Sequence, residues 1–157
     1  MKEVFNKALE ELNGGNEFVV ASVVKTSGST PQKPGSKLLV KTDGKTIGTL
    51  GGGCVEGDIW FASKEILEKG GKSKYQDYVL NEDLAANDGL VCGGTMYFLI
   101  DPYRKSNNEI NEKILSEIEK GYQGEFSLAS ATIVDSKEKN EIGNKLIIKD
   151  NGEIFGN

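Results

Sequence analysis

The hydrophobic and polar positions divide the chain into short strands and a few amphipathic helices. Residues 2–13 carry hydrophobic side chains at helical spacing, namely Val4, Phe5, Ala8, Leu9 and Leu12. Residues 18–24 form an unbroken hydrophobic run, which is typical of a buried strand. Hydrophobic residues at helical spacing predict a second helix that ends near Lys69 and a third over residues 107–120. Strand patterns cover residues 75–80 and 95–100.

A hairpin is predicted over residues 36–49, turning at Asp43-Gly44, because an Asp-Gly pair between two hydrophobic runs favours a tight turn. Residues 128–157 echo residues 18–49 and are predicted to be a degenerate repeat of them. The alternative is that any strand–turn–strand segment would look similar. If the repeat is real, its copy has lost the glycine-rich features described below.

The expected fold is a single α/β domain over residues 1–157, with a mixed β-sheet, hairpins and flanking helices. Hairpin turns favour antiparallel pairs, and the strand–helix–strand run from 46 to 80 allows one parallel crossover. Strand 95–100 is expected to lie beside the hairpin 36–49. A chain of 157 residues is long enough for one domain with a hydrophobic core.

Composition and charge exclude several classes of protein. The net charge of −5 argues against a general nucleic-acid binder. No hydrophobic run approaches the roughly 20 residues of a membrane span. The N-terminus lacks the hydrophobic core of a signal peptide, so we expect a cytoplasmic protein with reduced cysteines. The chain has no histidine, which removes histidine-based catalysis and most zinc sites.

The most informative stretch is the glycine turn, Gly51-Gly52-Gly53, which is followed by Cys54. It lies where a strand pattern gives way to a helix that is expected to begin within two residues of Cys54. The unpaired N–H groups of a helix start suit an anion and stabilise a thiolate. The alternative is a tight turn with a buried cysteine. Glu56, in the first turn of that helix, is either a capping carboxylate or a proton carrier.

A basic segment precedes the glycine turn. Residues 25–45 hold five lysines and one acid, a net charge of +4. Because the basic segment precedes a turn that suits an anion, it favours a ligand that carries a phosphate. The alternative is that its lysines only form the solvated face of a hairpin. The stretch is neither a Walker loop nor a dinucleotide fingerprint, because it lacks the Gly-Lys-Ser/Thr of the first and has Glu56 where the second needs glycine.

The glycine motifs resemble those of the XdhC/CoxI family, the xanthine dehydrogenase accessory factors. The resemblance covers about residues 18–100 and rests on these segments: Gly28-Ser29-Thr30-Pro31, Gly35-Ser36-Lys37-Leu38-Leu39-Val40, Asp43-Gly44, Gly48-Thr49, Gly51-Gly52-Gly53-Cys54-Val55-Glu56 and Val91-Cys92-Gly93-Gly94. It implies transient binding of molybdenum cofactor, help with its sulfuration, and insertion into a molybdenum hydroxylase. Many members continue into a Rossmann domain that this chain lacks, which fits a short member or a fragment.

The resemblance also assigns roles to residues. Cys54 and Cys92 are the candidate catalytic thiols, with Glu56 beside them, and Cys54 is the candidate molybdenum ligand. The cofactor-binding candidates come from the glycine segments and the basic segment: Gly28, Ser29, Thr30, Lys33, Lys37, Gly51, Gly52, Gly53, Cys54, Cys92, Gly93 and Gly94. Trp60 is expected to be a packing residue rather than a surface that stacks on the pterin.

Three functions stay open at this point. The first is a molybdenum cofactor chaperone. The second is a sulfurtransferase that holds a persulfide on Cys54 or Cys92. The third is a non-catalytic dimerising module in which the cysteines are only packed. The expected partners are a molybdenum hydroxylase client, a cysteine desulfurase and a second copy of the chain, with no nucleic acid and no membrane.

Overall fold

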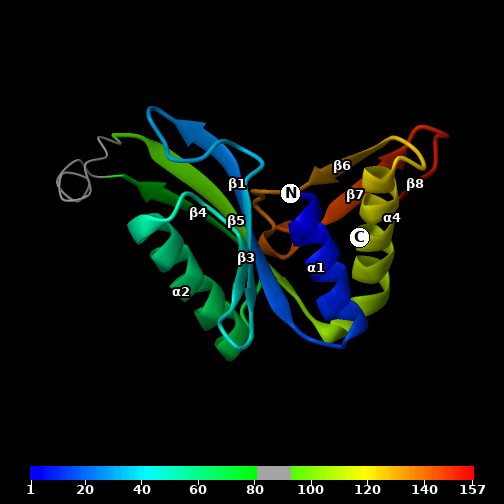
Figure 1. Cartoon of the computed structure of the whole chain (residues 1–157), viewed down its shortest axis with the longest axis horizontal. Helices are drawn as coiled ribbons and strands as arrows, with labels where there is room; N and C mark the ends of the chain where they lie inside the picture. Colours follow the sequence, from blue (N-terminus) through cyan, green and yellow to red (C-terminus); the bar gives the residue numbers. More distant parts are fainter. Residues whose placement is uncertain (81–92) are drawn as a thin grey trace.

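The computed structural model describes residues 1–80 and 93–157. Its elements follow in the order α1 (Lys2–Asn13), β1 (Phe18–Ser27), β2 (Lys37–Lys41), β3 (Thr46–Gly48), α2 (Gly53–Lys69), β4 (Lys74–Val79), β5 (Thr95–Tyr103), the short 3₁₀ turn η1 (Lys105–Asn107), α4 (Asn108–Gln123), β6 (Leu128–Thr132), η2 (Lys139–Glu141), β7 (Lys145–Lys149) and β8 (Ile154–Gly156). Figure 1 shows them as layers of helices and sheets.

The larger sheet has five strands in the order β3-β2-β1-β5-β4. Each neighbouring pair is antiparallel. The crossover through α2 therefore joins β3 and β4, which run in the same direction but lie at opposite edges of the sheet. β1 is the central strand, and its first six residues are buried.

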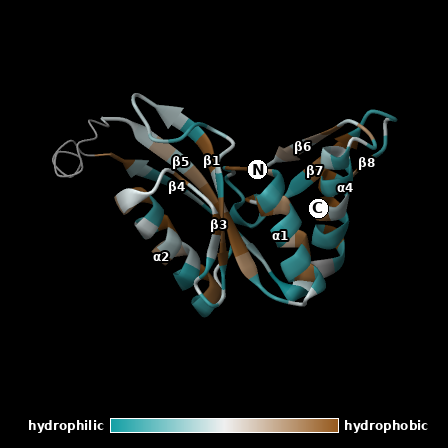
Figure 2. Cartoon of the chain, in the orientation of Figure 1, coloured by the Kyte–Doolittle hydropathy of each residue, from teal (hydrophilic) through white to brown (hydrophobic). Residues whose placement is uncertain are grey.

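The helix α2 covers one face of this sheet. Val55 and Ile59 of α2 pack on Leu38 and Val40 of β2, in a core that also includes inward-facing residues of β1 and β5. The hydrophobic colouring in Figure 2 follows the strands under the helix. Trp60 packs at the edge of this core and donates from Nε1 to the carbonyl of Gly44 (2.9 Å). Trp60 is thus a packing residue, as expected.

The helices α1 and α4 cover part of the opposite face. Val4 and Ala8 of α1 and Leu115 of α4 pack against Phe18 and Leu39 of the large sheet. The other side of α4 packs through Ile114 and Ile118 on Ile147 of a second sheet. This sheet has three antiparallel strands in the order β6-β7-β8. In Figure 1, α1 and α4 lie next to each other, on the side of the large sheet away from α2.

The two hairpins share one pairing geometry. Ala21 faces Leu38 in the first hairpin unit, and Ala131 faces Leu146 in the second. The return strands match as well, since Leu38 faces Gly48 and Leu146 faces Gly156. That one segment arose as a copy of the other stays a prediction, but their registers are the same.

The predicted α/β fold with hairpins and flanking helices is confirmed, but the expected mixed sheet is replaced by two sheets in which every described strand pair is antiparallel. The hairpin turns at Asp43-Gly44, where Gly44 has φ +83° and the Asp43 carboxylate accepts from the backbone N–H of Lys45 (3.0 Å). α2 begins at Gly53, within the expected distance of Cys54. No helix in the described ranges combines the length and the hydrophobicity that a membrane span needs. The predicted loop after Asn81 lies outside the described residues.

Candidate functional site: the glycine turn and the start of α2

The glycine turn takes a backbone shape that other residues rarely adopt. Gly51, Gly52 and Gly53 have φ values of +107°, +73° and +62°. A Cβ on Gly51 would lie 2.7 Å from Pro31, so this glycine allows the turn to pack against the loop after β1. A Cβ on Gly52 or Gly53 would meet nothing within 4 Å. These two glycines therefore leave their backbone open to an approaching ligand.

Glu56 is the side chain that holds the turn in place. Its Oε2 accepts from the backbone N–H of Leu50 (2.8 Å), the Thr49 hydroxyl (2.8 Å) and the backbone N–H of Gly52 (3.1 Å). Partial burial raises the pKa of Glu56, but these three hydrogen bonds outweigh it and lower the pKa below its usual value. Of the two roles left open by the sequence, the geometry favours the capping carboxylate.

Cys54 is a free, exposed thiol in the first turn of α2. It directly follows Gly53, the last glycine of the turn. The first N–H groups of a helix have no partners within the helix, and they carry partial positive charge. The arrangement can therefore offer a soft sulfur ligand and backbone donors to the same molecule.

Two further polar residues lie near Cys54, and sequence reasoning missed both. Asp58 is one helical turn further along α2, and Tyr78 comes from β4. Burial raises the pKa of Tyr78, and the carboxylate of Asp58 and the nearby Cys54 add to this shift. The spacing of Asp58 four residues after Cys54 could have indicated a shared helix face. No local pattern places Tyr78 there, because β4 reaches α2 only through tertiary packing.

The loop after β1 joins the glycine segments. On one side it meets Gly51 through Pro31. On the other side it packs against Gly94, where a Cβ would lie 2.4 Å from the carbonyl oxygen of Ser29 and 2.8 Å from Thr30. Gly28 also has little space around it, since a Cβ added there would lie 3.0 Å from the Cα of Gly94.

The structure thus gathers most of the predicted cofactor-binding residues at one end of the large sheet. Ser29 is exposed there. The hydroxyl of Thr30 donates to the carbonyl of Gln32 (3.0 Å), which stabilises the loop itself. The expectation that strand 95–100 lies beside the hairpin is wrong, because β1 lies between them. The loop after β1 makes the connection instead.

The two candidate lysines, Lys33 and Lys37, lie in different parts of the structure. Lys33 is exposed on the loop next to Pro31. Lys37 does not reach the glycine turn, which corrects its expected place there. Strand residues alternate between faces, so Leu38 points toward α2 while Lys37 points to the opposite face, where its ammonium donates to Ser22 Oγ (2.8 Å).

Cys92 lies outside the described residues, so its expected place beside Cys54 stays a prediction. Gly93, which follows it, is exposed next to the loop that contains Gly28. Among the described side chains, no group of three or more Cys, Asp or Glu residues could hold a metal ion.

The chain is similar to known proteins over much of its length. A probable xanthine dehydrogenase subunit of Bacillus subtilis (strain 168) is 28% identical over 147 residues, which cover 93% of this chain and 41% of the relative. The molybdenum cofactor insertion chaperone PaoD of Escherichia coli (strain K12) is 29% identical over 69 residues, 44% of this chain and 22% of the relative. The chain spans less than half the length of these relatives.

A solved structure shares the fold. The crystal structure of a xanthine dehydrogenase from Bacillus halodurans matches 97% of this chain and 44% of its own, with a TM-score of 0.72 and 23% identity. Residues 12–78 match the model of the XdhC and CoxI family. This segment contains the loop after β1, the glycine turn, Cys54 and Tyr78. Over this segment, the chain is similar to the XdhC and CoxI family.

Proposed function

We propose that this protein is an accessory factor that binds molybdenum cofactor as transient cargo and passes it to a molybdenum hydroxylase such as xanthine dehydrogenase. The observation that carries the proposal is the exposed Cys54 thiol beside Gly52 and Gly53, whose side of the turn is open. The match of residues 12–78 to the XdhC and CoxI family model and the similarity to PaoD, which is named a molybdenum cofactor insertion chaperone, support it.

The residues present fit this cargo. Molybdenum cofactor offers an anionic phosphate and a sulfur-ligated metal. The backbone N–H groups of Gly53 and Cys54, at the start of α2, suit an anionic oxygen. The thiol of Cys54 is a soft ligand that suits molybdenum. Gly52 has no side chain to keep the cargo away from the backbone.

The site favours binding and release over turnover. The carboxylate oxygen of Glu56 is already engaged by three donors, so Glu56 serves the shape of the turn rather than proton transfer. Gly51, Gly53 and Cys54 are all exposed, which leaves a client enzyme free access to the cargo.

A second candidate function is sulfur transfer through a persulfide on Cys54. The exposure of this thiol favours it, because a persulfide has to be reached by both a donor and an acceptor. A cysteine desulfurase would supply the sulfur atom. This partner, and a homodimer of the chain, stay predictions.

The test measures how much cofactor the purified protein retains. Protein is incubated with molybdenum cofactor released from a molybdenum enzyme, passed through a desalting column, oxidised and assayed for pterin fluorescence. Wild type is expected to retain pterin, and Cys54→Ser at least about tenfold less, because a hydroxyl is a poor ligand for a soft metal. Lys33→Glu should weaken retention, whereas Lys45→Glu, at the exposed tip of the hairpin, should not.

Controls separate the two functions. Cys54→Ala should change the free energy of unfolding by only about 1 kcal/mol or less, because the thiol is exposed. Incubation with a cysteine desulfurase and cysteine, followed by mass spectrometry, tests for one added sulfur on Cys54. If wild type retains no pterin, the chaperone proposal is wrong. If Cys54→Ser retains as much as wild type, Cys54 is not a ligand and the glycine backbone alone holds the cargo.

A further inference from the structure

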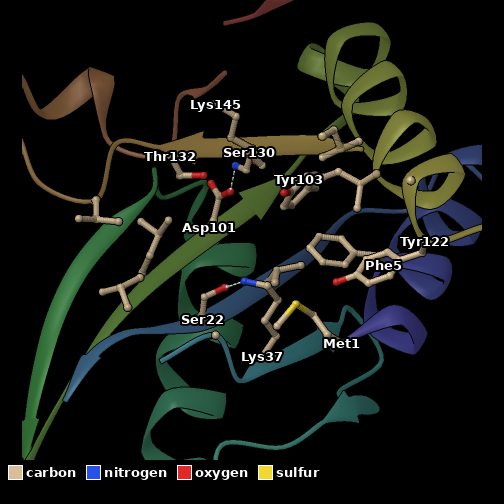
Figure 3. Close-up of a pocket in the computed structure, with 18 of the residues that line it drawn as sticks. Met1, Phe5, Ser22, Lys37, Asp101, Tyr103, Tyr122, Ser130, Thr132 and Lys145 are labelled. Carbon is tan, nitrogen blue, oxygen red and sulfur yellow. Dashed lines mark hydrogen bonds and ion pairs between the residues drawn. The ribbon is translucent and has the colours of Figure 1, made fainter. Parts of the chain in front are cut away.

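A cavity of about 610 Å³ lies between the two sheets, on the face of the large sheet away from α2. Its floor is formed by β1 and β5, with Val20, Ser22 and Leu99, and one wall by β6, with Ser130 and Thr132. Figure 3 shows these strands meeting around it, with the side chains of α1 and α4 along one side. We call it the inter-sheet cleft.

Aromatic and aliphatic side chains line the helical side of the cleft. The rings of Phe5 and Tyr122, from α1 and α4, lie with their centroids 5.9 Å apart. Phe126 and Leu128 continue this surface toward β6. A mostly apolar cavity of this size with a few polar groups is typical of small-molecule sites, which occupy roughly 300–1,000 Å³.

Two lysines at equivalent hairpin positions enter the cleft. Lys37 begins β2 and faces Ser22 across the hairpin, and Lys145 begins β7 and faces Thr132. Lys145 is ion-paired with Asp101 of β5 and donates to the carbonyl of Gly143 (2.8 Å). Its charge is therefore already balanced.

Lys37 has no such partner among residues 1–80 and 93–157. Its ammonium donates to the neutral hydroxyl of Ser22 and lies 5.7 Å from the centre of the Phe5 ring. Within the part of the chain that the structure describes, no carboxylate lies within ion-pair distance of it. Burial lowers the pKa of Lys37, and the nearby charge of Lys145 lowers it further, against a smaller opposing effect of Asp101. A half-buried ammonium in this state would be stabilised by an incoming anion.

We propose that the inter-sheet cleft binds a flat, largely apolar molecule that carries one oxyanion, a carboxylate or a phosphate, held by Lys37. The ring surfaces of Phe5 and Tyr122 contact its body, and Ser22 and the hydroxyls of β6 hydrogen-bond its polar edge. The charged side chains that line the cleft are Lys37, Lys145 and Asp101, and together they carry one positive charge, which favours an anion over a cation of the same shape.

This site is separate from the glycine turn. The turn leads into α2, on one face of the large sheet, whereas Lys37 and the cleft lie on the other face. The inference therefore does not rest on the proposed function. Substitution of Cys54 should leave the cleft unchanged.

The experiment uses anilinonaphthalene sulfonate, an aromatic monoanion whose fluorescence rises in apolar sites. Titration of the full chain is expected to saturate at one site. Lys37→Gln should weaken binding at least about tenfold, because a charge-assisted hydrogen bond is stronger than a neutral one. Lys33→Gln and Cys54→Ser should bind like wild type. The neutral analogue phenylnaphthylamine should bind wild type and Lys37→Gln equally.

A second variant keeps the test decisive if Lys37→Gln folds poorly. Ser130→Phe places a ring in the cleft from an exposed position of β6, and should abolish binding while circular dichroism stays unchanged. The proposal is overturned if the probe fails to saturate. It is also overturned if correctly folded Lys37→Gln or Ser130→Phe binds like wild type, or if amide shifts on probe binding map to β7 and β8 instead of β1 and β6.

Discussion

The two hairpins of this protein have the same register but different surroundings. In the first, Leu38 and Val40 are fully buried under α2. In the second, the matching residues Leu146 and Ile148 are 41% and 38% exposed. The two strands read Lys-Leu-Leu-Val-Lys and Lys-Leu-Ile-Ile-Lys, so their hydrophobic patterns are the same. Only the first hairpin is followed, within the described residues, by a glycine turn and a covering helix.

The comparison shows that the hydrophobic pattern of a strand determines how it pairs with its neighbours. The pattern does not determine whether another element buries the face of the strand. Both strands form because alternating β-branched and aliphatic residues suit a pleated surface between two neighbours. Whether the second face is buried depends on an element that follows the hairpin. The same holds for charge. Lys37 and Lys145 occupy matching positions, but among the residues that the structure describes only Lys145 contacts a carboxylate.

The largest predicted effect separates the covered face from the uncovered one. Leu38→Ala should lower the free energy of unfolding by about 3 kcal/mol, because it leaves a cavity under α2. Leu146→Ala makes the same chemical change on an exposed face and should cost less than about 1 kcal/mol. Urea unfolding followed by tryptophan fluorescence measures both. Equal losses would mean that the face of β7 is covered in solution.

The second prediction concerns the ion pair that joins the two sheets. Asp101 also accepts from the Ser73 hydroxyl (2.7 Å), and it is 7% exposed. Asp101→Asn keeps the shape but leaves the Lys145 ammonium buried without its counter-charge, and should cost about 2 kcal/mol. Lys37→Met, the matched change at the unpaired lysine, should cost less. If Lys37→Met lowers the free energy of unfolding as much as Asp101→Asn does, the proposed difference between the unpaired and the paired lysine is wrong.

The same pair predicts a pH dependence. Burial alone would lower the pKa of Lys145, but the Tyr103 hydroxyl and the Asp101 carboxylate outweigh it and raise the pKa. A raised lysine pKa contributes stability that is complete below the unfolded value, about 10.4, and is lost as the pH rises through the folded value. Alkaline unfolding of wild type should therefore show a loss of stability in that range that Lys145→Met lacks.

Local signals in the sequence predicted much of the fold and part of the site. The Asp43-Gly44 turn, the helix start at Gly53 and the register of strand and helix faces depend on neighbours in the chain. The position of β1 between β2 and β5, and the approach of Tyr78 to Cys54, depend on contacts between distant segments. The prediction that Lys37 lies near the glycine turn was wrong for a related reason. Lys37 lies on the sheet face opposite α2, and which face α2 covers is decided by tertiary packing.

The smallest predicted effect concerns the carboxylate that shapes the glycine turn, a feature of the first hairpin alone among the described residues. Glu56→Gln should lower stability at neutral pH by about 1 kcal/mol, the size of a lost helix cap. Because the pKa of Glu56 is lowered in the folded state, its contribution is complete above the unfolded value, about 4.3, and disappears as the pH falls through the folded value. The difference between wild type and variant should therefore shrink in acid, while Glu125→Gln, at an exposed position, should show no such trend. A difference that stays constant down to the lowest pH at which the protein folds would mean that Glu56 acts through packing rather than through its charge.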